Sequence, residues 1–395
     1  MGVAPTRLVI RLSPWKIPSG SLVEPTPVRR PTHVHSGLTR RTFPARGRAL
    51  TLSRVRTAFG VDFDVPDSYL NTPAIGIPPA PAVDAVRAAV QRWGAGLADP
   101  ADFDAPVAAA RGAFADLVGV PDRRVCVGSA VAQLVSLVAA GLDEHARVLA
   151  CAEDFTSITF PFAAQNLRGV TVTEAEPAQL PELVAEHDLV ATSVVRAGDG
   201  AMADLDGLRE AAAASGVPVL LDATQSLGWL PADLSWADWV VAAGYKWLLA
   251  PRGAAWMAVH PRALHRTRAV SANWFGGEDP WETTSGLPLR LADGARGFDL
   301  SPVWLAQVGA AETLPWLADR DVREVHAHCA GLADELRVRL GRAPTGSAIA
   351  AIDGADPQQL ARAGVRTSVR NGRERVGFHL YNTAEDLDRL CAQLA

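Results

Sequence analysis

The chain has 395 residues (41.8 kDa) and is 48% hydrophobic and 21% charged, which is enough material for one large core and a smaller second domain. Charged residues, Gly or Pro interrupt each apolar run before the roughly 20 residues of a membrane span, so no transmembrane helix is predicted. Four scattered cysteines without a Cys-x-x-Cys pair indicate neither a disulfide framework nor a zinc knuckle, and they favour a reducing cytoplasm.

Charge is distributed unevenly along the chain. Residues 1–52 hold nine basic side chains, one acidic side chain and seven prolines, and the rest of the chain carries −13. We therefore predict that residues 1–53 form a disordered basic extension. This segment does not have the continuous apolar stretch of a secretory signal peptide. The acidic remainder does not attract nucleic acid, so neither nucleic acid nor membrane is an expected partner.

The pattern becomes regular from about residue 69. Helices are predicted over residues 81–93 and 105–118. Seven short apolar, β-branched runs follow, at residues 125–127, 148–151, 170–173, 189–195, 217–221, 239–242 and 254–259. Helical stretches such as residues 130–142 and 205–215 separate most of these runs. Buried strands that alternate with helices predict an α/β fold with a mostly parallel seven-stranded sheet covered on both faces.

The order of predicted helices and strands changes after about residue 300. Helices are predicted over residues 322–340 and 357–363 and from residue 384, and strands over residues 347–352, 365–370 and 373–380. Asn371-Gly372 between two alternating strands predicts a tight hairpin. We therefore expect three parts: the extension 1–53, a large domain over 54–303 with an N-terminal segment, and a small α+β domain over 304–395.

Lysine is scarce in this chain. Lys16 and Lys246 are the two lysines among 38 basic Lys and Arg residues. Asp222 follows the predicted strand 217–221, and Lys246 follows the strand 239–242, so both are expected at one edge of the sheet. Pyridoxal phosphate needs this combination, since an amine forms an imine with its aldehyde and a carboxylate keeps its ring nitrogen protonated. The alternative is a helix-capping Asp and a surface Lys.

Two motifs carry a family resemblance. Residues 222–225 (Asp-Ala-Thr-Gln) and 244–247 (Gly-Tyr-Lys-Trp) resemble the class V aminotransferase family of fold-type I pyridoxal-phosphate enzymes, which includes cysteine desulfurases, kynureninases and isopenicillin N epimerase-like proteins. The resemblance extends from about residue 69 to the C-terminus. It implies that Lys246 forms the imine with the cofactor, that Asp222 pairs with the pyridine nitrogen and that Gln225 donates to the phenolic oxygen.

The cofactor phosphate is expected at residues 128–131 (Gly-Ser-Ala-Val), between a strand and a helix. A glycine turn exposes backbone N–H groups, and a helix N-terminus attracts an anion. Relatives often carry Thr or Ser where Ala130 stands, so Ser129 and the main chain are the expected donors. By the same resemblance Tyr245 is a candidate phosphate ligand, with packing as the alternative.

The resemblance also assigns residues around the cofactor ring and across a subunit interface. Phe155, in the segment 153–157, is the candidate that stacks on the ring, with an ordinary core position as the alternative. Ala197 stands where relatives often place an Asn near the phenolic oxygen. Trp274 and Ser301 lie in segments that relatives contribute to the neighbouring subunit's site, which implies a homodimer.

The C-terminal strand carries a candidate substrate ligand. Period-two alternation places Arg375, Gly377 and His379 on one face, opposite an apolar face. The segment resembles the family's Arg…Tyr-Asn-Thr motif, whose arginine binds the substrate carboxylate through two hydrogen bonds. The alternative is a solvated basic strand.

These residues predict an enzyme that acts on an amino acid or keto acid, with transamination as the first expectation. Epimerisation and β-elimination (a C–S lyase) need the same residues and stay open. Residues 367–373 contain no cysteine, which argues against desulfuration through a persulfide.

Other classes of protein are less consistent with the sequence. A silent binding or regulatory protein on the same fold lacks a recognisable partner-binding module, and a nucleotide enzyme lacks Gly-x-Gly-x-x-Gly after a strand. His326 and His328 are two residues apart on a helix and face different directions, so we predict no metal site.

Overall fold

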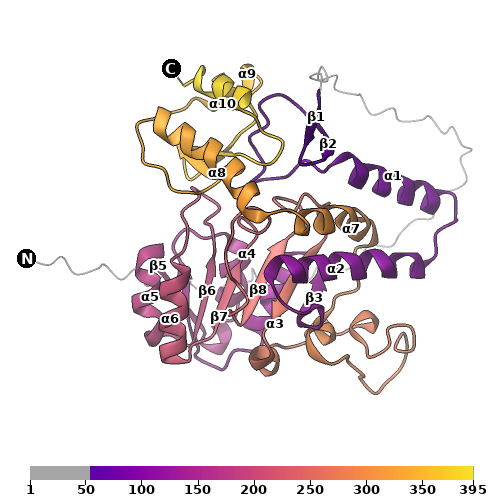
Figure 1. Ribbon diagram of the computed structural model, residues 1–395. Coiled ribbons are helices and arrows are strands. Elements are labelled where there is room, and N and C mark those ends of the chain that lie inside the picture. Colours follow the sequence, from indigo (N-terminus) through magenta and orange to yellow (C-terminus); the bar gives the residue numbers. More distant parts are fainter. Residues whose placement is uncertain (1–53, 395) are drawn as a thin grey trace, which may run out of the picture. The chain divides into compact units, whose positions relative to one another are not determined.

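The computed structural model describes residues 54–394 (Figure 1). The predicted extension over residues 1–53 therefore lies outside the described residues. The described part begins with a hairpin of strands β1 (Arg54–Ala58) and β2 (Val61–Val65). Its turn places Phe59 and Gly60 at positive φ, 48° and 82°. Phe63 and Val65 of this hairpin are buried, and the sequence analysis predicted no strands here.

A seven-stranded sheet forms the centre of the fold, in the order β3-β9-β8-β7-β6-β4-β5. Its strands are β3 (Val125–Gly128), β4 (Arg147–Cys151), β5 (Thr171–Ala175), β6 (Leu189–Ser193), β7 (Val219–Asp222), β8 (Trp239–Ala243) and β9 (Ala255–Val259). β9 runs antiparallel to both of its neighbours, and the other pairs are parallel. The predicted mostly parallel seven-stranded sheet is confirmed.

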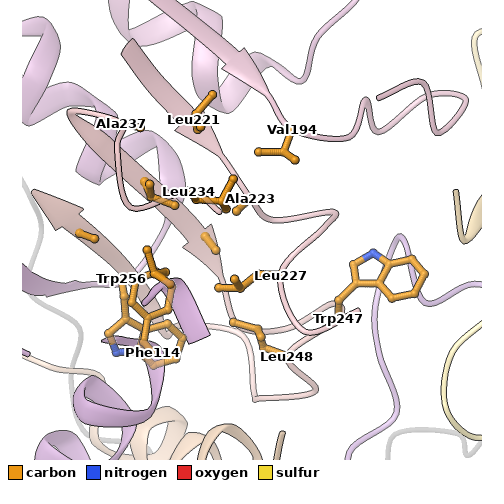
Figure 2. Packing of buried hydrophobic residues seen from close by; sticks show 14 of the residues in the cluster. Phe114, Val194, Leu221, Ala223, Leu227, Leu234, Ala237, Trp247, Leu248 and Trp256 are labelled. Carbon is orange, nitrogen blue, oxygen red and sulfur yellow. The ribbon is translucent and has the colours of Figure 1, made fainter. Parts of the chain in front are cut away.

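Helices cover both faces of this sheet, because strands that are apolar on both faces need to be buried on each side. The helices on one face are α2 (Asp104–Val118), α5 (Leu180–Leu183), α6 (Leu205–Ser215) and α7 (Trp304–Ala318), and those on the other are α3 (Val131–Ala139) and α4 (Thr156–Ala163). Figure 2 shows Phe114 of α2 beside Trp256 of β9, with ring centroids 5.6 Å apart. Helix α1 (Ala80–Gly94) packs against α7.

Helix α7 was not predicted from the sequence. Its residues are apolar on nearly every side, with Pro315 near its end, so no apolar stripe of helical period stands out. The helix packs against both α1 and α2. Because this helix is buried on several sides, it does not have the one-sided apolar stripe by which the sequence analysis recognises helices.

A second sheet of three strands follows, in the order β10-β12-β11, with β10 (Ile349–Ile352), β11 (Ser368–Arg370) and β12 (Arg373–Gly377) all paired antiparallel. Its helices are α8 (Val322–Arg339), α9 (Pro357–Arg362) and α10 (Ala384–Cys391). The predicted Asn371-Gly372 hairpin is confirmed, with both residues at positive φ. The domain boundary at residue 303 stays a prediction.

The chain just after the β1–β2 hairpin joins this second sheet. The Leu70 carbonyl accepts a hydrogen bond from Gly377 N (2.9 Å), and Asn71 bridges to Gly377 in parallel. Strand β12 ends at Gly377, three residues earlier than predicted; Phe378 N still donates to the Ala348 carbonyl opposite it, and the chain then turns at residues 379–382, where Asn382 N donates to the His379 carbonyl. Within residues 54–394, no helix combines the length and the apolar character that crossing a membrane requires.

Candidate active site

Asp222 and Lys246 lie at the carboxyl ends of two neighbouring parallel strands. Asp222 is the last residue of β7, and Lys246 lies three residues after the end of β8. Both side chains are buried, Asp222 at 4% and Lys246 at 6% relative exposure. The Asp222 carboxylate accepts a hydrogen bond from Thr224 N at 2.8 Å. The capped-helix and surface-lysine alternative is therefore wrong for Lys246, because a surface lysine is not buried.

Burial changes the proton affinity of both groups. Desolvation raises the pKa of Asp222 to about 6, against the opposing hydrogen bonds from Thr224, and nearby Asp154 adds to the rise. Desolvation lowers the pKa of Lys246 to about 8, and the carboxylate of Asp222 opposes this shift. Arg375, Arg370 and Arg252 lower the Lys246 pKa further. A substantial fraction of the Lys246 amine is consequently neutral near pH 8.

Two aromatic rings border the Lys246 amine. Nζ lies 5.1 Å from the centroid of Phe155 and 5.7 Å from that of Tyr245. Phe155 is 42% exposed, so it does not occupy an ordinary core position. Tyr245 is half-buried, and the guanidinium of Arg252 lies 5.3 Å from its ring. The accessible face of Phe155 is free to stack on a planar ligand.

Asp154, which the sequence analysis did not single out, holds Phe155 in place. Its carboxylate accepts hydrogen bonds from Phe155 N (2.7 Å), Ser193 N (2.8 Å) and Ser193 Oγ (2.5 Å). The neighbouring Glu153 adopts φ 57°, a strained value for a residue with a side chain. These bonds fasten the turn after β4 to the end of β6. No local sequence pattern could have indicated this long-range contact.

The predicted phosphate segment lies between β3 and α3. Ala130 is the N-cap of α3 and is exposed, and no side chain caps this end of the helix. Ser129 is half-buried beside it. The amide of Gln133, one turn into α3, is buried without a partner among the described residues. A Cβ on Gly128 would lie 2.7 Å from Cγ of the fully buried Leu134, so a side chain at this position would force Leu134 to shift.

Gln225 is held by protein groups on both sides of its amide. Oε1 accepts from Trp247 Nε1 at 2.7 Å, and Nε2 donates to the Pro73 carbonyl at 3.0 Å. One amide hydrogen therefore remains for any ligand. The contact with Pro73 ties the segment before α1 to the Lys246 loop.

The segment 69–77 reinforces this connection. Gly76 N donates to the Tyr245 carbonyl at 2.9 Å. A Cβ on Gly76 would lie 2.1 Å from the Lys246 carbonyl oxygen, so a side chain is excluded at this position. The sequence analysis placed this segment at the start of the ordered chain but gave it no role.

Arg375 is buried on β12 at 2% exposure, so the solvated-strand alternative is wrong. It donates to the Ala197 carbonyl (2.6 Å) and to Ser368 Oγ (2.9 Å), while its Nε has no partner. No carboxylate within residues 54–394 forms an ion pair with it. Desolvation lowers its pKa to about 10, and the charge of Arg370 adds to this shift. A buried guanidinium without an acidic partner among the described residues is costly, and an anionic ligand would offset that cost.

The segments that contain Trp274 and Ser301 contact each other, and the second also contacts β3. Trp274 is half-buried and packs against Phe275 and Trp281. Ser301 is also half-buried, and the preceding Leu300 N donates to the Val127 carbonyl of β3. Asn273 Nδ2 joins the two segments by donating to the Asp299 carbonyl at 2.7 Å.

Comparisons with known proteins place this geometry in a family context. The model of the family described as aminotransferase class-V matches residues 86–360. The uncharacterized aminotransferase YcbU of Bacillus subtilis is 26% identical over 310 residues, which is 72% of this chain and 82% of that protein. Isopenicillin N epimerase of Streptomyces clavuligerus is 25% identical over 354 residues, which is 75% of this chain and 87% of that protein.

Solved structures share the fold at lower sequence identity. A complex of the cystine C–S lyase C-DES with cysteine persulfide has a TM-score of 0.74 at 20% identity, covering 83% of this chain and 97% of that one. Cysteine desulfurase CsdA of Escherichia coli has a TM-score of 0.70 at 20% identity, covering 83% of this chain and 94% of that one. The expected fold-type I architecture is confirmed.

Proposed function

Because the chain belongs to the class V aminotransferase family, we propose that it transfers the amino group of an amino acid to a keto acid at the site of Lys246 and Asp222. The observation that carries this proposal is the buried Arg375, whose guanidinium lacks an acidic partner within residues 54–394. An α-carboxylate supplies the missing charge, and guanidinium and carboxylate groups match through two parallel hydrogen bonds.

Pyridoxal phosphate is the cofactor of this family, and the residues at the site fit it. The exposed ring of Phe155 suits a planar group, the uncapped start of α3 suits a phosphate, and the unpartnered amide of Gln133 lacks a ligand there. Ser129 and the main chain of Ala130 supply further donors, with Tyr245 alongside. When bound, the cofactor supplies a ring that stabilises negative charge at the substrate Cα.

Lys246 and Asp222 divide the proton chemistry between them. Lys246 would hold the cofactor through Nζ, and its amine would accept the Cα proton of the substrate; a pKa of about 8 suits an amine that works near neutral pH. Asp222 would hold a proton at the ring nitrogen. Its buried carboxylate is unscreened by water, which strengthens its attraction for that proton. Gln225 would have its remaining amide hydrogen to donate to the phenolic oxygen.

Epimerisation is the second candidate, because a relative named isopenicillin N epimerase covers three quarters of the chain. Epimerisation would use Lys246 and Asp222 in the same way to remove the Cα proton, and it would need a proton donor on the opposite face of Cα. C–S elimination needs only Lys246 and Asp222. The four cysteines of the chain are free; Cys126, Cys151 and Cys329 are buried, and Cys391 lies in α10. This distribution agrees with the expectation that the enzyme does not desulfurate through a persulfide.

Incubation of the holoenzyme with a panel of amino acids in D₂O tests the reaction. If the reaction is transamination, each site should form one equivalent of keto acid when no acceptor keto acid is added. With an acceptor keto acid, turnover should continue. Epimerisation predicts deuterium at Cα with racemised substrate and no keto acid, and elimination predicts ammonia together with the keto acid. Lys246→Ala should abolish each of these, and borohydride should trap pyridoxal phosphate on Lys246 in the wild type. Failure to bind the cofactor would overturn the proposal.

We also infer a homodimer in the cytoplasm. The support for the dimer is the position of Trp274 and Ser301, two residues that relatives present to a neighbouring subunit. Ser301 follows Leu300, which bonds to β3 next to the proposed phosphate segment. The free cysteines fit a reducing compartment. Sedimentation of the purified protein tests the dimer.

A further inference from the structure

The residue that follows Lys246 is fixed from several directions. Trp247 is fully buried, and its indole lies between the rings of Trp229 (5.4 Å) and His379 (5.1 Å). Its Nε1 donates to Gln225, and its carbonyl oxygen lies 2.9 Å from His379 Nε2. The backbone on the C-terminal side of Lys246 is therefore attached to a residue more than 130 positions away in the chain.

The hydrogen bonds of His379 define its tautomer. Nδ1 accepts from Leu380 N at 2.7 Å, so the ring proton is on Nε2, which donates to the Trp247 carbonyl. Burial lowers the pKa of His379 to about 4, partly opposed by the bond to Trp247. The neighbouring His328 lowers the pKa of His379 further, and the His379 ring also packs against Tyr381. His379 is consequently neutral at the pH where Lys246 works.

His379 also lies on the chain segment that carries Arg375. It lies two residues after the end of β12, and its own N–H donates to Asn382 Oδ1 at 2.8 Å, which closes a tight turn. Arg375 is four residues earlier and is held to the Ala197 carbonyl. One short segment thus contains the guanidinium expected to bind the substrate carboxylate and the imidazole that holds the Lys246 loop.

We propose that His379 is a positioning residue that acts through the Trp247 carbonyl to set the place of Lys246 relative to Arg375. This inference rests on the proposed function of those two residues. An amine that transfers a proton at Cα must lie at a fixed distance from the group that holds the carboxylate, since a displacement of about 1 Å can reduce turnover by up to about 100-fold. The bond between His379 and Trp247 fixes that distance across two sheets.

Two substitutions separate the two hydrogen bonds of the ring. In His379→Asn the amide oxygen reaches the position of Nδ1 and keeps the bond from Leu380 N, but no donor reaches Trp247. In His379→Gln the amide nitrogen reaches the position of Nε2 and keeps the bond to Trp247. His187→Asn is the matched control, since His187 is also buried and bonds to one backbone carbonyl, that of Leu183.

The experiment measures kcat, KM and backbone hydrogen exchange of the peptide around Lys246. We expect His379→Asn to lower kcat by roughly 10-fold to 100-fold with little change in KM, and to speed exchange in that peptide. His379→Gln should retain kcat within about threefold, and His187→Asn should match the wild type. Equal losses in the Asn and Gln variants, or unchanged exchange in His379→Asn, would overturn the proposal. Because exchange is measured with or without cofactor, it tests the positioning even if the proposed reaction fails.

Discussion

Two buried arginines of this chain have opposite surroundings. Arg111 of α2 forms two hydrogen bonds with the carboxylate of Asp299, at 2.7 and 3.0 Å, and a third with the Val125 carbonyl. Arg375 of β12 is as deeply buried but contacts a carbonyl and a hydroxyl, with one N–H unpartnered. Asp299 also accepts from Val127 N, so the first pair is complete within the fold. The second arginine has no such carboxylate among residues 54–394, which agrees with the proposal that a ligand neutralises it.

This difference separates a structural charge from a functional one. A guanidinium that satisfies a buried carboxylate fastens two chain segments, here α2 and the segment that contains Asp299. A guanidinium without such a partner weakens the fold, because desolvation is not compensated. The fold retains Arg375 in spite of this penalty, which is understandable when an anionic substrate provides the missing interaction.

Substitution of each arginine by Met should separate the two roles. Arg111→Met leaves Asp299 buried without its partner, and we expect the free energy of unfolding to fall by about 3–5 kcal/mol. Arg375→Met removes an uncompensated charge and should leave the free energy of unfolding unchanged or higher. Denaturant titration at neutral pH measures both values. Equal destabilisation by the two substitutions would contradict the comparison.

Asp222 is a third buried charge, and its stability effect depends on pH. Its pKa is raised from 3.8 to about 6 in the folded protein, so its contribution to stability is present below pH 3.8 and is lost as the pH rises through 6. Above pH 6 this loss amounts to about 3 kcal/mol. Asp222→Asn cannot ionise and should stabilise the cofactor-free protein at pH 8.

Unfolding of the cofactor-free wild type and Asp222→Asn at pH 4.5 and pH 8 checks this prediction. The advantage of the variant should be small at the lower pH and should grow by about 2–3 kcal/mol at the higher one. An advantage that is independent of pH would mean that ionisation of Asp222 has no part in it. The same variant should lose activity, because it cannot hold a positive ring nitrogen.

Arg370 should have the smallest effect, because it is exposed on the hairpin. Its charge adds to the lowering of the Lys246 pKa, after desolvation and Arg375. We expect Arg370→Gln to raise the acid limb of the kcat profile by about 0.3 pH unit at low salt, and salt to remove the difference. Arg362→Gln, an exposed arginine of α9, is the control. A shift that persists in 1 M salt would show that the effect is not electrostatic.

The sequence predicted the features that depend on local pattern. The strand ends at Asp222 and Lys246, the alternating strands and the Asn371-Gly372 turn each follow from residues close together in the chain. The hairpin turn at Phe59-Gly60 was missed because a bulky residue occupies the positive φ where Asn or Gly is expected. Helix α7 was missed because it is apolar on most sides.

The contacts that complete the site are not local. The hydrogen bonds of Gln225 with Pro73 and Trp247 join residues 152 and 22 positions apart, and His379 reaches Trp247 across 132. The missing partner of Arg375 could not be inferred either, because a sequence does not show which carboxylates lie nearby. Whether a buried charged group has an oppositely charged partner is decided by the folded structure and not by residues nearby in the sequence.

The measurement that most directly tests the role of Arg375 compares an amino acid with its α-amide as substrates for the wild type and Arg375→Gln. Both compounds carry the reacting amine, and only the amino acid carries the carboxylate. If Arg375 binds that group, the substitution should lower kcat/KM for the amino acid by about 100-fold and for the amide by less than about threefold. Equal losses for the two compounds would contradict the account, because Arg375 would then not act on the carboxylate.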